Sequence, residues 1–307
     1  MVDYLLKRLI SAVLVILGVS TLVFLLIHLV PGDPVEVMLG ETVQQGDVEL
    51  LRHQLGLDLP VFQQWLQFML HLARFDLGQS LFTSQPVAQL LLDRIPATVV
   101  LAISSLVIAV SIALPLGVLA ALRRGTSWDF LAMGVSILGI SIPNFWMGPM
   151  LVLIFSIGLD WLPVSGFQGP LSLILPALTL GSAMAAILSR MVRSSLLEIL
   201  QEDYIRAARA RGLSSFQIII RHALPNAALP IITVIGLQLG SLLAGAVITE
   251  TIFSWPGIGQ LTIDAIQKRD YPVVQACVLL ISMTYVIVNL LTDIVCAGLD
   301  PRIRLEA

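Results

Sequence analysis

The chain alternates long apolar runs with shorter polar connections. Six of the runs are about 20 residues long, which is the length a helix needs to cross the hydrocarbon core of a bilayer, about 30 Å thick. This pattern predicts an all-α polytopic membrane protein with six transmembrane helices, at Leu9–Val30, Thr98–Leu122, Leu131–Ile157, Leu171–Ser189, Leu229–Ile248 and Val274–Ala297.

The first apolar run lies where a secretory signal peptide would lie. The stretch from Leu5 to Pro31 is too long for the apolar region of a signal peptide, and no small-residue cleavage site precedes the turn sequence that begins at Pro31. We therefore interpret this run as a retained first transmembrane helix.

Composition agrees with a membrane protein. Hydrophobic residues make up 57% of the chain, charged residues only 12%, and the mean hydropathy is +0.93, whereas about a quarter of the residues of a soluble domain are charged. Cys277 and Cys296 both fall in the last apolar run, too far apart along one helix to form a disulfide. Cysteine spacing supports neither a disulfide framework nor a zinc site.

The positions of the cations predict how the helices are oriented. If Lys7 and Arg8 lie in the cytoplasm, six crossings return the C-terminus to the cytoplasm too. Cytoplasmic segments of membrane proteins carry an excess of Lys and Arg. This orientation places 12 of the 17 cations inside, namely Lys7, Arg8, Arg123, Arg124, Arg190, Arg193, Arg206, Arg209, Arg211, Arg221, Arg302 and Arg304.

The chain is expected to divide into a first part, residues 1–96, a five-helix part, residues 97–298, and a cytoplasmic tail, residues 299–307. The first part holds one transmembrane helix and a long, acidic extracytoplasmic segment, Pro31–Pro96. Apolar residues recur at helical spacing over Val61–Leu72 within that segment. This predicts an amphipathic helix at the outer membrane surface, or alternatively a docking surface for a soluble partner or part of a gate.

Several catalytic motifs are missing. Lysine occurs only at positions 7 and 268, so the chain has no phosphate-binding G-x-x-x-x-G-K-[ST] loop. It has no G-x-S-x-G or H-E-x-x-H motif, and no pair of histidines at metal-binding spacing. Acids within apolar runs are functional candidates by default; these are Glu250, and Asp293, which lies close enough to the cytoplasmic end to be solvated. We expect no catalytic residue, no metal site and no cofactor bound by this chain.

The polar segment between the fourth and fifth apolar runs, residues 193–228, is unusually rich in arginine. A helix is expected over Asp203–Arg211, ending at Gly212, because glycine tolerates left-handed backbone. Ser214 or Ser215 can cap a second helix over Phe216–Ala223, which Pro225 then limits. The arginines of the first helix would face solvent or an acidic partner, and its alanines, Ala207, Ala208 and Ala210, would allow close approach.

Two simpler interpretations of this segment remain open. It could be a solvated basic loop that only follows the positive-inside rule. A helix-turn-helix that binds DNA is disfavoured because both ends of the segment are tethered to transmembrane helices.

The same segment resembles the coupling loop of type I, binding-protein-dependent ABC importers, with pattern E-A-A-x-x-x-G-x(9)-I-x-L-P. Matching positions are Ala207, Ala208, Gly212, Leu224 and Pro225, whereas Arg206 and His222 replace the family's Glu and Ile. The dipeptide, oligopeptide and nickel branch tends to have Y-x-R-x-A-R-A-x-G. That form is matched by Tyr204, Arg206, Ala208, Arg209, Ala210 and Gly212.

Further short motifs extend the resemblance over nearly the whole chain and are specific as an ordered series. They begin at Pro31, Gly56, Asp76, Ile95, Pro143, Trp161, Ile174, Glu250, Arg269 and Leu299. The chain is similar to the first of the two permease subunits in such systems, the subunit with a long extracytoplasmic segment after its first helix.

The resemblance implies a MetI-like transmembrane fold in a bacterial inner membrane. It also implies a second homologous permease subunit, two ABC ATPase subunits that bind ATP and Mg²⁺, and an extracytoplasmic solute-binding protein. The residues that the resemblance implies for coupling to the ATPase are Tyr204, Arg206, Ala207, Ala208, Arg209, Ala210, Gly212, Leu224 and Pro225. It implies no nucleic-acid partner. We favour di- and oligopeptides as substrates, with a nickel chelate or glutathione as alternatives.

The translocation pathway is harder to place. The sequence Pro143-Asn144-Phe145-Trp146 is expected to break the third transmembrane helix, which would put Asn144 and Trp146, together with Glu250, along the pathway. A simple packing kink is the alternative. An ion-coupled secondary transporter or an intramembrane enzyme is disfavoured, because the sequence lacks an inverted repeat, midplane carboxylates and a paired catalytic constellation.

Overall fold

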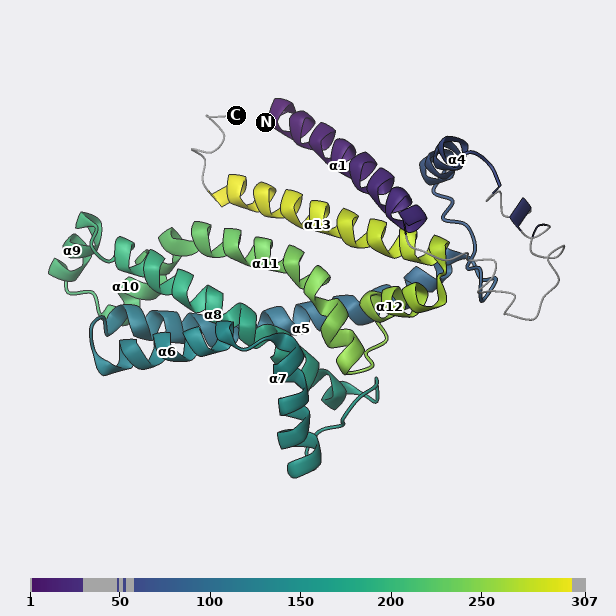
Figure 1. The fold of residues 1–307 in the computed structure, drawn as a ribbon. Helices are drawn as coiled ribbons and strands as arrows, with labels where there is room; N and C mark the ends of the chain where they lie inside the picture. The colour runs from purple at the N-terminus through teal and green to yellow at the C-terminus, as the bar shows by residue number, and fades with distance from the viewer. Residues whose placement is uncertain (1, 30–48, 50–51, 54–57, 300–307) are drawn as a thin grey trace. The chain divides into compact units, whose positions relative to one another are not determined.

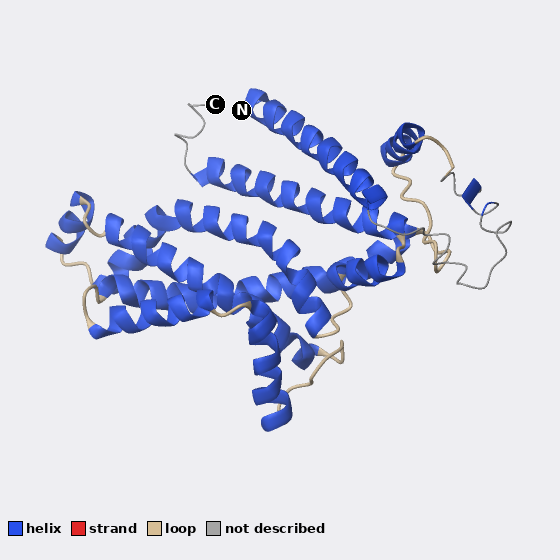
Figure 2. Ribbon diagram, viewed as in Figure 1, coloured by secondary structure: helices blue, strands red, loops and turns tan. Residues whose placement is uncertain are grey.

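The computed structural model describes residues 2–29, 49, 52–53 and 58–299, and these residues are mostly helical (Figure 2). No strand occurs among them, and only one isolated β-bridge joins Gln79 to Pro86. The all-α prediction is confirmed. The motif beginning at Pro31, the first two residues of the motif beginning at Gly56, and nearly all of the predicted tail lie outside the described residues. The long helices are α1 (Val2–Leu29), α5 (Val87–Leu122), α8 (Ile174–Ile199), α11 (Leu224–Ile252) and α13 (Tyr271–Leu299).

The shorter helices connect or flank the long ones (Figure 1). They are α4 (Val61–Ala73), α6 (Ser127–Ser141), α7 (Asn144–Leu151), α9 (Asp203–Ala210), α10 (Ser215–Ile218) and α12 (Ile258–Lys268). Helix α7 continues into a π-helical stretch, Val152–Gly158, a 3₁₀ turn at Pro170–Leu173 precedes α8, and a second π-helical stretch, Ile219–Ala223, joins α10 to α11.

Four helical stretches are long and apolar enough to cross a membrane: Val87–Leu122, Pro170–Ile199, Ser215–Leu242 and Tyr271–Gly298. A fifth is α6 together with α7 and its π-helical extension, if that bent pair forms one span. Within α1 the apolar part is the shorter Val13–Leu25. The predicted polytopic class therefore holds, and the count of six transmembrane helices stays a prediction.

The boundary of one predicted span changed. The predicted second span begins at Thr98, but α5 begins at Val87 and passes through Pro96 without a break. At 1.5 Å per residue its 36 residues extend over about 54 Å, well beyond the bilayer core. The third span is broken as expected, because α6 and α7 meet at 102° around Ile142 and Pro143.

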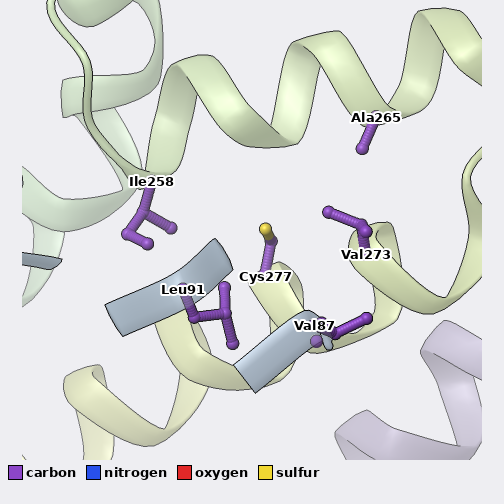
Figure 3. Packing of buried hydrophobic residues seen from close by; sticks show 7 residues of the cluster. Val87, Leu91, Ile258, Ala265, Val273 and Cys277 are labelled. Carbon is purple, nitrogen blue, oxygen red and sulfur yellow. The ribbon is translucent and has the colours of Figure 1, made fainter. Parts of the chain in front are cut away.

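The chain forms two compact units. One unit contains Val99–Trp255 and residues 285–299, and the other contains Val2–Thr98 and Pro256–Thr284. In the second unit, Val87 and Leu91 at the start of α5 pack with residues of α12 and α13 around the Cys277 side chain (Figure 3). The Thr98 hydroxyl accepts a hydrogen bond from the Ile258 N–H, 2.9 Å away, which fixes the start of α12.

Helix α4, also in the second unit, packs against α1. The Trp65 indole N–H donates to the Thr21 hydroxyl at 3.2 Å, and the rings of Phe24 and Phe68 stack with centroids 5.8 Å apart. The helix expected over Val61–Leu72 is therefore confirmed. Its placement at the outer surface, and its alternatives as a docking surface or gate, stay predictions.

Two of the short sequence motifs meet in the second unit. The Ser80 hydroxyl donates to one carboxylate oxygen of Asp270 at 2.5 Å, and the Leu81 N–H donates to the other at 3.2 Å. Ser80 Oγ also accepts from the Thr83 N–H at 3.0 Å. Both Ser80 and Asp270 are buried. This network attaches the turn between α4 and α5 to the junction of α12 and α13.

We expect Asp270→Ala to destabilise the second unit by about 1–3 kcal/mol, because the Ser80 hydroxyl and the Leu81 N–H lose their buried acceptor. The apparent Tm of the purified protein should fall. Asp93→Ala, at an exposed position of α5, is the matched control and should leave the Tm unchanged. An equal Tm for both variants would contradict a stabilising role for the network.

Helix α8 is the central helix of the first unit and packs against α6, α7 and α11. Its buried positions include many small residues, which allow neighbouring helices to come close in an apolar environment. These small buried residues include Ala177, Gly181, Ala185, Ala186, Ser189 and Ser195.

Candidate functional site

The best candidate for a functional site is the α9–α10 segment, residues 203–218, which connects α8 to α11 (Figure 1). Two short helices with a tight corner between them form the segment. A three-residue turn joins it to α8, and the π-helical stretch Ile219–Ala223 joins it to α11.

The C-terminus of α9 is a Schellman motif. Gly212 has φ +80°, its N–H donates to the Arg209 carbonyl at 2.9 Å, and the Leu213 N–H donates to the Ala208 carbonyl at 3.3 Å. Gly212 is therefore the left-handed residue that ends the helix, as the sequence predicted.

The N-terminus of α10 has a capping box. The Ser214 hydroxyl accepts from the Gln217 N–H at 3.3 Å, and the Gln217 side-chain oxygen accepts from the Ser214 N–H at 3.0 Å. Of the two predicted capping residues, Ser214 is the one that caps the helix. These local hydrogen bonds give the corner one defined conformation.

A small apolar core holds the two helices together. Ile205 and Ala208 of α9 and Ile218 of α10 are buried against one another, and Leu213, Ile199 and Leu200 pack around them. Ala208 is only 2% exposed, so its small size serves packing inside the segment. The expectation that Ala208 permits close approach of a partner was wrong, whereas Ala207 and Ala210 are exposed.

The opposite face of α9 is exposed and basic. It presents Tyr204, Arg206, Ala207, Arg209, Ala210 and Arg211. Arg206 pairs with Asp203 at 3.1 Å, but both side chains are largely exposed, so this pair adds little stability. Arg209 and Arg211 lie near the C-terminus of the helix, where positive charge is favourable.

Tyr204 lies at the edge of this face. Partial burial and the Glu202 carboxylate raise the pKa of Tyr204 above its usual value, and a hydrogen bond with the Asn226 side chain lowers it in part. The phenol therefore stays protonated at neutral pH.

Leu224 and Pro225 do not end a helix, which corrects the prediction that Pro225 limits the second helix. They form the first turn of α11, directly after the π-helical stretch Ile219–Ala223. Proline is tolerated there because the first turn leaves its N–H groups without helical partners. The Asn226 side-chain amide donates to the His222 carbonyl at 2.6 Å, across the start of the long apolar α11.

An ion pair between α6 and α8 was not predicted from the sequence. The Arg193 guanidinium of α8 forms two hydrogen bonds with the Asp129 carboxylate of α6. Sequence reasoning counted Arg193 only as an inside cation and did not single out Asp129. The only sequence signal was that each is an ionisable residue bordering a predicted span, and 64 positions separate them.

The predicted pathway residues have different environments. Asn144 is half-buried and Trp146 is 50% exposed, both in the first turn of α7. Helix α7 packs against the end of α11, where Gly148 lies next to Phe253. Glu250, three residues before Phe253, has no exposed surface. The structure thus brings the two segments together but encloses the Glu250 side chain, which faces no open surface in this conformation.

The fold defines a polytopic membrane protein whose α9–α10 segment lies between two membrane-length helical stretches. Comparison with known proteins identifies the class. Residues 113–305 match the family described as the inner membrane component of binding-protein-dependent transport systems, and residues 1–102 match the N-terminal family of such membrane components. The chain belongs to this family of inner membrane transport components.

Relatives that match over their full length show which transport systems this chain resembles most specifically. The chain is 45% identical to the di/tripeptide transport system permease protein DppB of Pseudomonas aeruginosa and 41% identical to the glutathione transport system permease protein GsiC of Escherichia coli O6:H1. Each alignment covers 99% of this chain and 99% of the relative. The resemblance to permeases of the peptide, glutathione and nickel group is confirmed, and with it the prediction that the chain is a transport subunit and not an enzyme.

A solved structure supports the fold independently. The MetNI methionine ABC transporter in an inward-facing conformation matches with a TM-score of 0.62 at 20% identity. The match covers 71% of this chain and 100% of the MetNI chain. At this identity the likeness establishes the MetI-like transmembrane fold alone.

Proposed function

We propose that the exposed face of the α9–α10 segment is the surface on which a separate ATPase subunit docks. The observation that carries the proposal is how the segment is built. It has a Schellman corner, a capping box and a small apolar core around Ile205, Ala208 and Ile218. These features stiffen two helices that would otherwise be too short to be stable. A solvated loop would need none of these features. ATP hydrolysis on another polypeptide requires a stiff element of this kind to receive its movement.

The remaining partners and the orientation follow from the family. The chain would pair with a second homologous permease subunit, two ABC ATPase subunits would bind ATP and Mg²⁺ on the cytoplasmic side, and a solute-binding protein would deliver substrate on the other side. The distribution of Lys and Arg supports cytoplasmic termini in a six-helix topology with a long extracytoplasmic segment after the first helix.

We expect Ala207→Trp to prevent ATPase docking. Ala207 is exposed and shares a helix face with Tyr204 and Ala210, so an indole there would keep a partner helix or groove at a distance. The amount of ATPase recovered with the tagged permease should fall about tenfold or more, which corresponds to a loss of about 1.4 kcal/mol. The apparent Tm of the permease variant should not change, because Ala207 is on the surface.

Ala207→Ser is the control, since it keeps a small side chain at the same exposed position. It should recover the ATPase as the natural chain does. If Ala207→Trp also recovered normal amounts of ATPase, the docking surface would have to lie elsewhere.

We propose di- and oligopeptides as the transported solutes. The support is the 45% identity to a di/tripeptide permease over the full length. Glutathione is the second candidate, because a glutathione permease is 41% identical over the same extent and glutathione is itself a tripeptide. A nickel chelate is the third.

The solute is tested on the partner solute-binding protein. Mass spectrometry of the ligand that it retains on purification, followed by calorimetry with a dipeptide, a tripeptide, glutathione and a nickel chelate, separates the three candidates. Binding of the nickel chelate but of none of the peptides would overturn the peptide assignment.

A further inference from the structure

The ion pair between α6 and α8 has a geometry that fixes the two helices relative to each other. Arg193 Nε lies 2.7 Å from Asp129 Oδ1, and Arg193 Nη2 lies 2.8 Å from Oδ2. The Gly125 N–H donates to Oδ2 at 3.0 Å. The side chain of Asp129 is 6% exposed and that of Arg193 is 27% exposed. A bidentate, largely desolvated pair of this kind has one favourable geometry.

Two more contacts continue along the same helix pair. The hydroxyl oxygens of Ser136 and Ser189 are 2.7 Å apart, and both residues are buried. Further along, a Cβ added at Gly139 would come within 3.0 Å of the Ala186 Cβ, which shows that the helices touch there. Residue numbers rise along α6 as they fall along α8, so the helices are antiparallel and are held at three successive levels.

The two helices lead to different parts of the first unit. Helix α8 ends at Ile199, four residues before α9 begins, so α8 receives any movement of the α9–α10 segment. Helix α6 ends at Ser141, where the chain bends by 102° into α7, which presents Asn144 and Trp146. A rigid α6–α8 pair therefore connects the docking surface to the bend.

We propose that Asp129 and Arg193 are positioning residues that make α6 move together with α8, so that displacement of the α9–α10 segment reaches the α6–α7 bend. This inference rests on the proposed function of that segment. Apolar contacts between membrane helices compete with equally apolar lipid, and they set the relative position of two helices only weakly. The charged pair, supported by the two hydroxyls, removes that freedom at the end of α8 nearest to α9.

The first test measures the number of solute molecules transported per ATP hydrolysed by the complete complex in proteoliposomes. Asp129→Asn keeps the size of the side chain and removes its charge, and Arg193→Lys keeps a charge and removes the bidentate geometry. Both are expected to leave ATPase subunits bound but to lower the transport-to-hydrolysis ratio about fivefold or more, the lower range of typical coupling between sites.

The second test replaces the ion pair by a covalent link. Ser136→Cys with Ser189→Cys places two thiols within reach of a disulfide, in a chain whose natural cysteines, Cys277 and Cys296, are changed to alanine. Oxidation should leave transport intact when Asp129 is present, because the two helices do not slide. In the Asp129→Asn chain, oxidation should restore the ratio, and reduction should lower it again.

Two outcomes would overturn the inference. If Asp129→Asn lowered only the yield of assembled complex and left the ratio unchanged, the ion pair would be a structural support. If the disulfide alone stopped transport, the helices would have to slide in each cycle. Failure of the proposed docking surface is distinguishable, because it would appear as normal ATPase recovery with Ala207→Trp whatever the result at Asp129.

Discussion

Gly212→Val should uncouple the importer with no loss of membrane insertion. Gly212 has φ +80° and nothing lies within 4 Å of an added Cβ, so the effect comes from backbone conformation and not from a clash. A left-handed conformation costs an L-residue about 1–2 kcal/mol, and a β-branched residue more. The ratio of correctly folded to misfolded α9–α10 corners should fall about tenfold, and ATP-dependent uptake should fall as the misfolded fraction grows.

Gly212→Asn is the control for this prediction, because asparagine is one of the few residues with a side chain that adopt left-handed backbone readily. It should keep most of the uptake. Hydrogen exchange of peptides that cover residues 203–218 should be faster in the valine variant and near normal in the asparagine variant. Equal uptake by both variants would mean that the Schellman corner is not needed for coupling.

Ile205→Asp should abolish ATPase docking by unfolding the segment. Ile205 has no exposed surface and packs against Ala208 and Ile218. An aspartate there either buries an unpaired carboxylate, at a cost of several kcal/mol, or turns outwards and opens the small core. We expect recovery of the ATPase with the tagged permease to fall below detection.

The matched control is Gln201→Asp, an exposed polar position just before α9, which adds the same charge without entering the core. It should keep ATPase recovery and uptake close to normal. If Gln201→Asp were as damaging as Ile205→Asp, added negative charge would explain both results, and the role assigned to the apolar core would be contradicted.

The local features of the α9–α10 segment were predictable because each depends on residues close in sequence. Gly212 ends α9 because only a residue without a side chain enters left-handed backbone at no cost, and the Ser214 cap needs only Gln217, three positions later. The prediction at Pro225 was wrong because proline is compatible with two contexts, the end of one helix and the first turn of the next. The structure has the second, just after a π-helical stretch that sequence pattern does not reveal.

The sequence by itself determined the membrane class, most of the apolar helices and the position of the α9–α10 segment. Hydropathy and capping depend only on residues that are close together in the sequence. Only the tertiary structure decided that Ala208 faces inwards, that Ser80 meets Asp270 and that Asp129 meets Arg193. The two polar contacts join residues 64 and 190 positions apart. Which partner each polar side chain finds depends on how whole helices pack, and no periodicity within a single helix contains that information.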